Sequence, residues 1–384
     1  MSASPNDAAA PRVGDPVDAV DTPALVIDLD AMERNLAAMA AFARDRGVRL
    51  RPHAKMHKSA AIARLQRAAG AVGVCVQKTS EAEALAAAGV DDIYISNEVV
   101  DRAKLARVAR LAMRVRLAIA VDSIEGIERL AAAVRDAGAQ IDVFVEVDVG
   151  QGRCGAPPAA AGSLAHRVVS HAPPDGGLRF AGLQAYHGGA QHLRGADERE
   201  AASRHAAALA SAARAGITAL GIACPLVTGA GTGTFAFDAA SGVWGELQAG
   251  SYLFMDRDYA DNAPAPGVPR FEHALFVKSQ VMSRGTSHAV VDAGHKSHAV
   301  DSGLPRVWQR ELAFANGGDE HGILRPLPGG DPGALPQLGE TVWLVPGHCD
   351  PTVNLHERYV AVRGGLAGGV VEAVWPIEAR GCLS

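Results

Sequence analysis

Between Val48 and residue 249 the chain alternates short β-branched runs with longer Ala-, Arg- and Leu-rich segments of helical period. This alternation predicts repeated strand–helix units and a parallel sheet, because parallel neighbours are joined by crossover helices. The predicted strands are 48–53, 73–77, 92–95, 117–122, 141–147, 180–186, 222–228 and 246–249. The predicted helices include 31–45, 101–112, 124–137 and 195–214.

Polar residues that could act at a site follow nearly every one of these strands. In a closed (β/α)8 barrel the loops after all eight strands share one mouth, whereas an open sheet gathers such residues at a single switch point. We therefore predict a TIM-type (β/α)8 barrel over 31–265.

The texture changes after residue 265, where helical patterns disappear and short strands alternate with Gly/Pro turns. Strands are predicted at 273–282, 288–293, 341–345, 358–363 and 369–376. We predict a C-terminal all-β domain, 266–384, which the run at 21–30 joins as an N-terminal strand. The acidic, proline-broken segment 1–20 is expected to be a flexible arm.

Composition restricts the function classes. A net charge of −5 and dispersed basic residues give no attraction to nucleic acid or anionic membranes, and 48% hydrophobic residues suffice for two cores. No apolar run is long enough to span a bilayer, and the N-terminus lacks a signal peptide pattern. Five dispersed cysteines without CxxC spacing argue against a disulfide framework. We expect a cytoplasmic protein with a small-molecule ligand.

Lys55 is the strongest candidate for chemistry among the residues at the strand ends. Lysines are scarce within the 37 Lys+Arg, and only an amine forms a Schiff base. Its alternative interpretation is a solvated basic pair with Lys58. The other candidates at the mouth, each also explicable as a packing or surface residue, are Gln77, Arg153, Tyr186, His187, His192, Thr228 and Gln248.

Two Gly-containing turns follow the last two predicted barrel strands. TGAGTGT, 228–234, supplies backbone N–H groups and hydroxyls, and Gly250-Ser251-Tyr252 follows the eighth strand. Phosphate sites of such barrels commonly lie on these loops. Together with a reactive lysine they indicate pyridoxal 5′-phosphate (PLP) rather than a nucleotide.

GHCDP contains a candidate metal pair, His348 and Asp350. On an extended segment these two side chains would point the same way and Cys349 the opposite way. A nitrogen and a carboxylate suit Mn²⁺, Mg²⁺ or a similar divalent ion. Taken alone, a His-x-Asp pattern favours a β-turn in which Asp350 caps a backbone amide, so the metal pair depends on the family resemblance given below.

Nine ordered motifs carry a family resemblance: RPHAKMHKS, VQKTSEAE, NEVV, EVDVGQGRCG, GLQAYHGG, TGAGTGT, ELQAGSYLFMD, DEHG and GHCDPTVNLHE. Together they resemble the D-threonine aldolase / eukaryotic-type D-serine dehydratase family of alanine-racemase-like PLP enzymes. The similarity extends from Asp21 to Gly381 and implies a barrel with an additional β domain.

The resemblance implies a role for each matching residue. Lys55 would bind PLP covalently, with Gln77 nearby, Arg153 at the phenolate oxygen and Tyr186 against the ring. Gln248 stands where alanine racemases have an arginine beside the ring nitrogen, and a neutral amide leaves the protonation of that nitrogen open. The phosphate would be held by Thr228, Gly231, Thr232, Gly250, Ser251 and Tyr252.

The implied reaction is retro-aldol cleavage of a D-β-hydroxy-α-amino acid, with His192 as the base and His348 and Asp350 as metal ligands. The dehydratase branch has Cys at the second ligand position, which suits Zn²⁺, so Asp350 favours the aldolase branch. D-serine or D-3-hydroxyaspartate dehydration, 3-hydroxy-D-aspartate cleavage, racemisation and a non-catalytic PLP carrier remain alternatives. A homodimer is expected by analogy, whereas His295, Lys296 and His298 have no assigned role.

Overall fold

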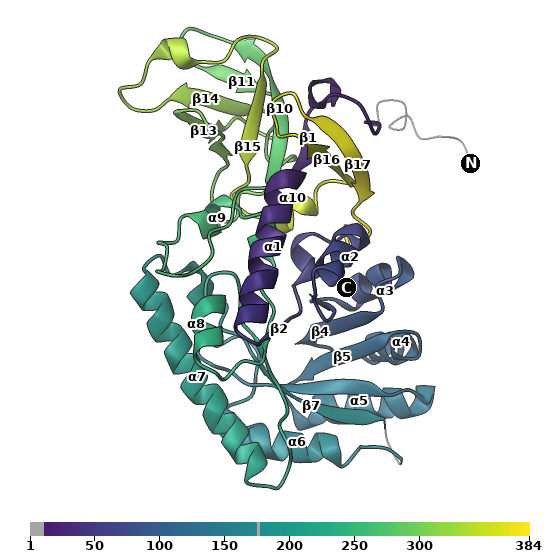
Figure 1. The fold of residues 1–384 in the computed structure, drawn as a ribbon. Coiled ribbons are helices and arrows are strands. Elements are labelled where there is room, and N and C mark those ends of the chain that lie inside the picture. Colours follow the sequence, from purple (N-terminus) through teal and green to yellow (C-terminus); the bar gives the residue numbers. More distant parts are fainter. Residues whose placement is uncertain (1–10, 175–176) are drawn as a thin grey trace, which may run out of the picture.

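The computed structural model describes residues 11–174 and 177–384, which form a barrel of parallel strands and a second, larger sheet above it (Figure 1). The barrel strands are β2 (Arg49–Leu50), β3 (Val74–Val76), β4 (Asp92–Glu98), β5 (Arg116–Val121), β6 (Ile141–Glu146), β7 (Leu178–Ala185), β8 (Val227–Gly229) and β9 (Glu246–Leu247). The helices around them are α1 (Leu29–Asp45), α2 (Ala60–Ala68), α3 (Thr79–Ala87), α4 (Arg102–Ala112), α5 (Ile124–Ala137), α6 (Ala161–Val169), α7 (Ala196–Thr218) and α8 (Phe235–Ala240).

The eight parallel strands close into a ring. Their order is β2-β9-β8-β7-β6-β5-β4-β3, so closure requires contact between β2 and β3. A parallel bridge between His53 and Cys75 supplies it, and the Cys75 N–H donates to the Pro52 carbonyl over 2.9 Å. The predicted α/β barrel is therefore confirmed.

Several barrel strands are shorter than predicted, and proline explains two of them. The run predicted at 222–228 forms a strand only from Val227, because Pro225 has no N–H to donate to a neighbouring strand. Pro52 likewise follows the short β2. In both places the backbone leaves the sheet early, and the residues beyond it turn into the mouth of the barrel.

The second sheet has nine strands and includes the N-terminal strand β1 (Ala24–Asp28). This strand lies between β10 (Leu275–Arg284), with which it is antiparallel, and β16 (Arg358–Arg363), with which it is parallel. The other strands are β11 (Ala289–Val291), β12 (Arg306–Val307), β13 (Leu312–Asn316), β14 (Gly322–Pro326), β15 (Thr341–Val345) and β17 (Val370–Pro376). Sequence reasoning missed the short strands β12, β13 and β14.

Residues 1–20 were expected to form a flexible arm, and residues 1–10 lie outside the described part. Residues 11–20 differ from this expectation. The short 3-10 helix η2 (Val17–Ala19) packs on the sheet, and Val17 is fully buried. The buried Lys278 ammonium donates to the backbone carbonyls of Val17, Asp18 and Val20. Residues 11–20 are thus held against the β domain, and the prediction of a flexible arm is wrong for them.

The β domain and the barrel are joined by apolar packing and by specific hydrogen bonds. One cluster of buried apolar residues continues from the barrel into the β domain. The Tyr359 hydroxyl of β16 donates to the His57 carbonyl over 2.6 Å, and the Cys349 N–H donates to Asp256 over 2.9 Å. Helix α10 (Cys349–Val353) is thereby placed at the mouth of the barrel.

None of the helices in the described part of the chain has both the length and the apolar character needed to cross a bilayer. All five cysteines are free thiols, in agreement with the predicted lack of a disulfide framework.

Candidate active site

A cavity of about 120 Å³ lies at the barrel mouth, between the strand ends and α10. Twelve of the fifteen predicted site residues line it. They are Lys55, Gln77, Arg153, Tyr186, His192, Gly231, Thr232, Gln248, Gly250, Ser251, His348 and Asp350. The other three, Thr228, His187 and Tyr252, do not line it. Thr228 and Tyr252 are completely buried, and His187 is partly buried.

Lys55 lies in the 3-10 helix η3 (Ala54–Met56), directly after β2 and Pro52. Its Nζ is 3.4 Å from Asp350 Oδ2, and 41% of its side chain is exposed. Burial acts to lower the pKa of Lys55, but the Asp350 carboxylate outweighs it, so the pKa lies above its ordinary value. The amine therefore faces the acidic residue of the predicted metal pair.

His53 and Gln77 form a polar wall beside Lys55. The His53 Nε2 and Gln77 Nε2 atoms are 2.9 Å apart, and the Lys55 N–H donates to His53 Nδ1 over 3.3 Å. Burial, followed by the charge of Lys55, lowers the pKa of His53 well below its ordinary value. The imidazole is thus neutral at physiological pH and accepts at Nδ1.

The two Gly-containing loops after β8 and β9 meet at one end of the cavity. The Tyr252 N–H donates to Thr232 Oγ1 over 3.0 Å, which ties the loops together. A Cβ atom on Gly250 would lie 2.8 Å from the His53 carbonyl oxygen, so only glycine fits there. Within the described residues, the N–H groups of Gly231, Thr232, Gly250 and Ser251 donate to no protein acceptor. Such free amides fit a phosphate.

Arg153 and Tyr186 lie together on another wall. The Arg153 guanidinium carbon is 5.6 Å from the centre of the Tyr186 ring, a cation–π distance. Asp148 organises the loop before Arg153, because its Oδ1 accepts from the N–H groups of Gly150, Gln151 and Gly152. These hydrogen bonds, that of Gly152 first, lower the pKa of Asp148.

His348 and Asp350 lie on the same side, though not for the predicted reason. Only His348 is extended, as the residue capping α10, and Asp350 lies within that short helix. His348 Nε2 is 3.7 Å from Asp350 Oδ1, while Cys349 is fully buried on the other side. The extended segment is thus corrected to a helix start.

The pair fits a divalent cation. Asp350 Oδ1 is buried without a hydrogen-bond partner, an uncommon condition that a cation would relieve. His348 Nδ1 is 2.7 Å from Asp301 Oδ2, which leaves Nε2 to face Asp350, as in metal sites where a carboxylate orients the histidine. No group of three or more His, Cys, Asp or Glu side chains within residues 11–174 and 177–384 forms a metal cluster, so a cation here would need ligands beyond this pair.

The segment with His295, Lys296 and His298 supports α10 from outside the cavity. The Ala299 N–H donates to Thr352 Oγ1 over 3.0 Å, and His356 Nε2 is 2.8 Å from the Ser297 carbonyl oxygen. Sequence reasoning left all three residues without a role. His295 and Lys296 form ion pairs with surface carboxylates, whereas His298 is buried. The segment ends in Asp301, the partner of His348.

His192 enters the cavity from the 3-10 helix η5 (Gly189–His192) after β7. Its Nδ1 is 2.6 Å from Asp258 Oδ2, and Arg194 donates to Asp258 Oδ1. Asp258 therefore accepts from Nδ1–H and leaves Nε2 with its lone pair. Sequence reasoning missed Asp258 and Asp301. An acidic run just after β9, MDRDYAD, was the available signal for Asp258, whereas Asp301 lies in a distant loop.

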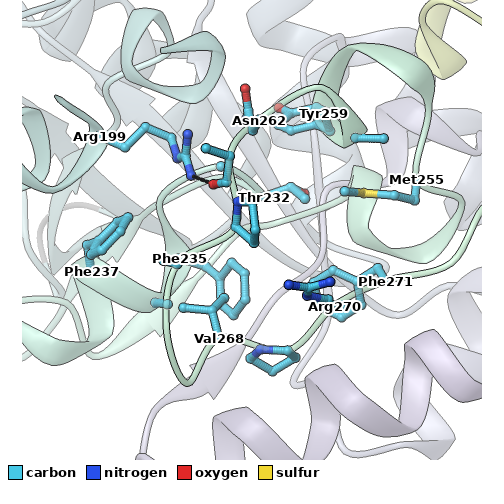
Figure 2. A pocket seen from close by; sticks show the side chains of 17 residues that line it. Arg199, Thr232, Phe235, Phe237, Met255, Tyr259, Asn262, Val268, Arg270 and Phe271 are labelled. Carbon is cyan, nitrogen blue, oxygen red and sulfur yellow. Dashed lines mark hydrogen bonds between the residues drawn. The ribbon is translucent and has the colours of Figure 1, made fainter. Parts of the chain in front are cut away.

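A second cavity, of about 240 Å³, shares Thr232 of the loop after β8 with the first cavity and is lined by neither Lys55 nor His192. Figure 2 shows its largely apolar lining, with Phe235, Val268 and Phe271 around it. Arg199 at its edge donates to backbone carbonyls of Leu193 and Ala263. Phe235 and Phe271 pack against each other and line this cavity together with Thr232, which also faces the first cavity.

Comparison with known proteins agrees with this geometry. The alanine racemase N-terminal domain family matches residues 27–258, and a serine dehydratase domain family matches 274–362. The chain is 48% identical to D-threonine aldolase of Arthrobacter sp over 96% of its length and 95% of that protein. The chain belongs to the D-threonine aldolase family.

The chain is also similar to an aldolase and a dehydratase that act on 3-hydroxyaspartate. The chain is 42% identical to 3-hydroxy-D-aspartate aldolase of Paracoccus denitrificans, covering 94% of this chain and 92% of that one. It is 32% identical to D-threo-3-hydroxyaspartate dehydratase of Delftia sp. over 89% of this chain and 94% of the other. A solved structure of a mutant of that dehydratase is in a metal-free form. All these relatives are lyases, so the predicted enzyme class is confirmed.

The fold also matches that of a solved D-threonine aldolase. The crystal structure of D-threonine aldolase from Filomicrobium marinum superposes with a TM-score of 0.92 at 50% identity, covering 97% of this chain and 99% of that one. The family predicted from the nine motifs, and the barrel with its additional β domain, are confirmed.

Proposed function

We propose that this enzyme cleaves D-threonine and other D-β-hydroxy-α-amino acids, including 3-hydroxy-D-aspartate, to glycine and an aldehyde. The observation that carries this proposal is the 3.4 Å distance between Lys55 Nζ and Asp350 Oδ2 in a cavity that His192 also lines. A group that handles the substrate amine and a pair that handles its β-hydroxyl are thus adjacent. These are the two substituents that flank the bond to be broken.

The residues around Lys55 fit PLP as the organic cofactor. Lys55 would bind it covalently, and the unpaired amides of Gly231, Thr232, Gly250 and Ser251 would hold its phosphate. PLP bound there supplies an electron sink for the negative charge left at Cα after cleavage. Arg153 and Tyr186 would flank the ring. Thr228 would act indirectly, because its hydroxyl donates to Glu246 instead of facing the cavity.

His348 and Asp350 would hold a divalent cation, for which Mn²⁺ or Mg²⁺ suits the nitrogen-plus-carboxylate pair. Such an ion supplies Lewis acidity that lowers the pKa of a bound hydroxyl. The free Nε2 of His192 would accept the proton of the β-hydroxyl, and Asp258 keeps the other imidazole nitrogen protonated. Asp301 keeps His348 turned toward Asp350.

The decisive experiment incubates the purified protein with D-threonine, PLP and Mn²⁺. We expect acetaldehyde and glycine in equal amounts, with L-threonine inert as the control. A keto acid and ammonia would instead identify a dehydratase. Exchange of the Cα hydrogen without cleavage would identify a racemase, and bound PLP without turnover of any D-amino acid would identify a carrier.

We also propose a cytoplasmic homodimer, in line with the expectation from fold relatives that one subunit's β domain reaches the neighbouring barrel. Sedimentation equilibrium at the concentration used for the activity assay tests it, and a monomer there would contradict it.

A further inference from the structure

The buried end of the active-site cavity is formed by Gln248, which is only 4% exposed. Its Nε2 donates over 2.8 Å to Gln184 Oε1 and over 2.8 Å to Thr228 Oγ1. Both N–H bonds of the amide are therefore used. The carbonyl oxygen has only a 3.5 Å contact with Gln184 Nε2, so it keeps the capacity to accept from a ligand.

An amide has two ends of similar shape, so its orientation follows from what its neighbours can donate or accept. On one side, a chain of hydrogen bonds runs from Glu246 through Thr228 to Gln248. Glu246 is fully buried and forms ion pairs with Arg51 Nε at 3.1 Å and with Arg49 Nη2 at 2.9 Å. A carboxylate between two guanidinium groups only accepts. Thr228 therefore gives its single proton to Glu246 Oε1, at 2.9 Å, and can only accept from Gln248.

The partner on the other side leads to the same orientation. The Tyr94 hydroxyl donates to Gln184 Oε1 over 3.0 Å. Burial, together with the charge of Glu146, raises the pKa of Tyr94 well above its ordinary value, so the phenol keeps its proton. Gln184 thus also presents an acceptor, and the amide of Gln248 has acceptors on both sides.

We propose that Glu246 and Thr228 are positioning residues that make Gln248 a hydrogen-bond acceptor toward the ring nitrogen of PLP, so that the enzyme binds the cofactor with this nitrogen protonated. The inference rests on the proposed function. In PLP the ring nitrogen is opposite the carbon that bears the aldehyde. A cofactor joined to the half-exposed Lys55 therefore directs that nitrogen toward the buried end, where Gln248 lies.

This arrangement has a chemical consequence. A ring nitrogen that faces a carbonyl oxygen forms a hydrogen bond only if it carries a proton, whereas one that faces an N–H donor bonds only if it does not. A protonated ring withdraws electrons from Cα more strongly than a neutral one. The network would thus favour the cleavage step.

The test uses the holoenzyme without substrate, loaded with PLP that is ¹⁵N-labelled in the ring, and records the ¹⁵N resonance by solid-state NMR. The variants are Thr228→Val, which removes the acceptor, Thr228→Ser, which keeps it, and Gln248→Glu, which provides an obligate acceptor. Visible absorbance verifies cofactor binding in each sample, and circular dichroism verifies folding.

We expect the pyridinium resonance in the wild type, Thr228→Ser and Gln248→Glu. In Thr228→Val, where Gln184 is the one remaining acceptor for the Gln248 amide, we expect a partial shift toward the neutral-pyridine position. A neutral-pyridine resonance in the wild type would overturn the inference, even if Thr228→Val failed to fold. An unshifted resonance in folded Thr228→Val would overturn the role of Thr228. A wild type that binds no PLP would refute the proposed function itself, whereas bound PLP with a neutral ring refutes only this inference.

Discussion

Lys55 and Lys58 are three residues apart, yet their surroundings give them different capacities. Lys58 Nζ pairs with Glu81 in the interior, and only 7% of its side chain is exposed, so it is confined to a structural role. Lys55 projects into the cavity with 41% of its side chain exposed. The sequence allowed two interpretations: Lys55 and Lys58 as a solvated basic pair, or Lys55 as a reactive amine. The burial of Lys58 against Glu81 and the exposure of Lys55 in the cavity decide between these interpretations.

The Lys55→Ala variant should bind no PLP covalently. We expect its visible absorbance band to disappear and its aldolase activity to fall to background, because no other amine lines the cavity within the described residues. Absorbance spectra and a D-threonine assay measure both effects. Lys104→Ala, on the outer helix α4, is the matched control and should change neither. A full absorbance band in Lys55→Ala would remove the central assignment.

Asp258→Asn should be more harmful than Asp258→Ala. Arg194 donates to one Asp258 oxygen, so an asparagine would keep its oxygen there and turn its NH2 toward His192 Nδ1. The imidazole would then carry its proton on Nε2 and could not act as a base, as in triads with a wrong tautomer. We expect kcat to fall by roughly 10²- to 10⁴-fold.

The measurement is steady-state kinetics on D-threonine, with cofactor absorbance as the control for an intact site. Asp258→Ala lets water take the place of the carboxylate and should retain more activity. An Asn variant as active as the wild type would exclude His192 as the base.

Among the elements, α10 shows what sequence reasoning could and could not reach. The identity and common direction of His348 and Asp350 were predicted, because GHCDP is distinctive. The helix start was not predictable, because α10 has five residues and depends on a tertiary bond from the Cys349 N–H to Asp256. Asp301 was missed for a similar reason: it approaches His348 across 47 residues, a proximity that no local pattern encodes.

Asp238, a buried acid between α8 and α7, should make the free energy of unfolding depend on pH. Asp238 accepts from Thr234 Oγ1 over 2.6 Å and from Ser203 Oγ over 2.5 Å. Burial nevertheless raises its pKa from 3.8 to about 6. The folded state therefore holds this proton more tightly than the unfolded state. The stabilising contribution is complete below pH 4 and is lost as the pH rises through about 6.

The Asp238→Asn variant lacks this titration. Relative to the wild type, its free energy of unfolding should rise between pH 4 and pH 7, by at most roughly 3 kcal/mol. Urea unfolding at a series of pH values measures the difference between the two proteins. Asp197→Asn, on the exposed face of α7, should stay parallel to the wild type. A constant difference between Asp238→Asn and the wild type would contradict the prediction.

At the scale of the whole molecule, the barrel and the β domain were predicted because local patterns indicate them. Strand-like and helix-like segments alternate in the barrel, whereas short strands and Gly/Pro turns follow in the β domain. Closure of the ring was predicted only indirectly, from polar residues after nearly every predicted strand. In the structure it depends on His53 and Cys75, whose pairing is not visible in the sequence. The three short strands β12, β13 and β14 escaped because strands of two to five residues within Gly-rich loops carry little alternation.

The cavity is divided between the domains, and this division predicts that the two proposed cofactors, PLP and a divalent cation, can be lost separately. Lys55 and the phosphate loops belong to the barrel, whereas His348 and Asp350 belong to the β domain. Exhaustive treatment with EDTA should therefore abolish cleavage of D-threonine and leave the visible PLP absorbance in place. Added Mn²⁺ should restore activity, because protein hydrogen bonds, from the Cys349 N–H to Asp256 and from the Tyr359 hydroxyl to the His57 carbonyl, place α10 at the mouth.

His348→Ala should behave like the chelated wild type, with PLP bound and turnover lost, and Mn²⁺ should not rescue it. Lys55→Ala is the reciprocal control, since it should lose the absorbance while still binding Mn²⁺ in a titration followed by electron paramagnetic resonance. If chelation released PLP as well, the two sites would not be independent. If chelated enzyme kept full activity, His348 and Asp350 would have no catalytic metal to hold, and the base at His192 would have to act on an unactivated hydroxyl.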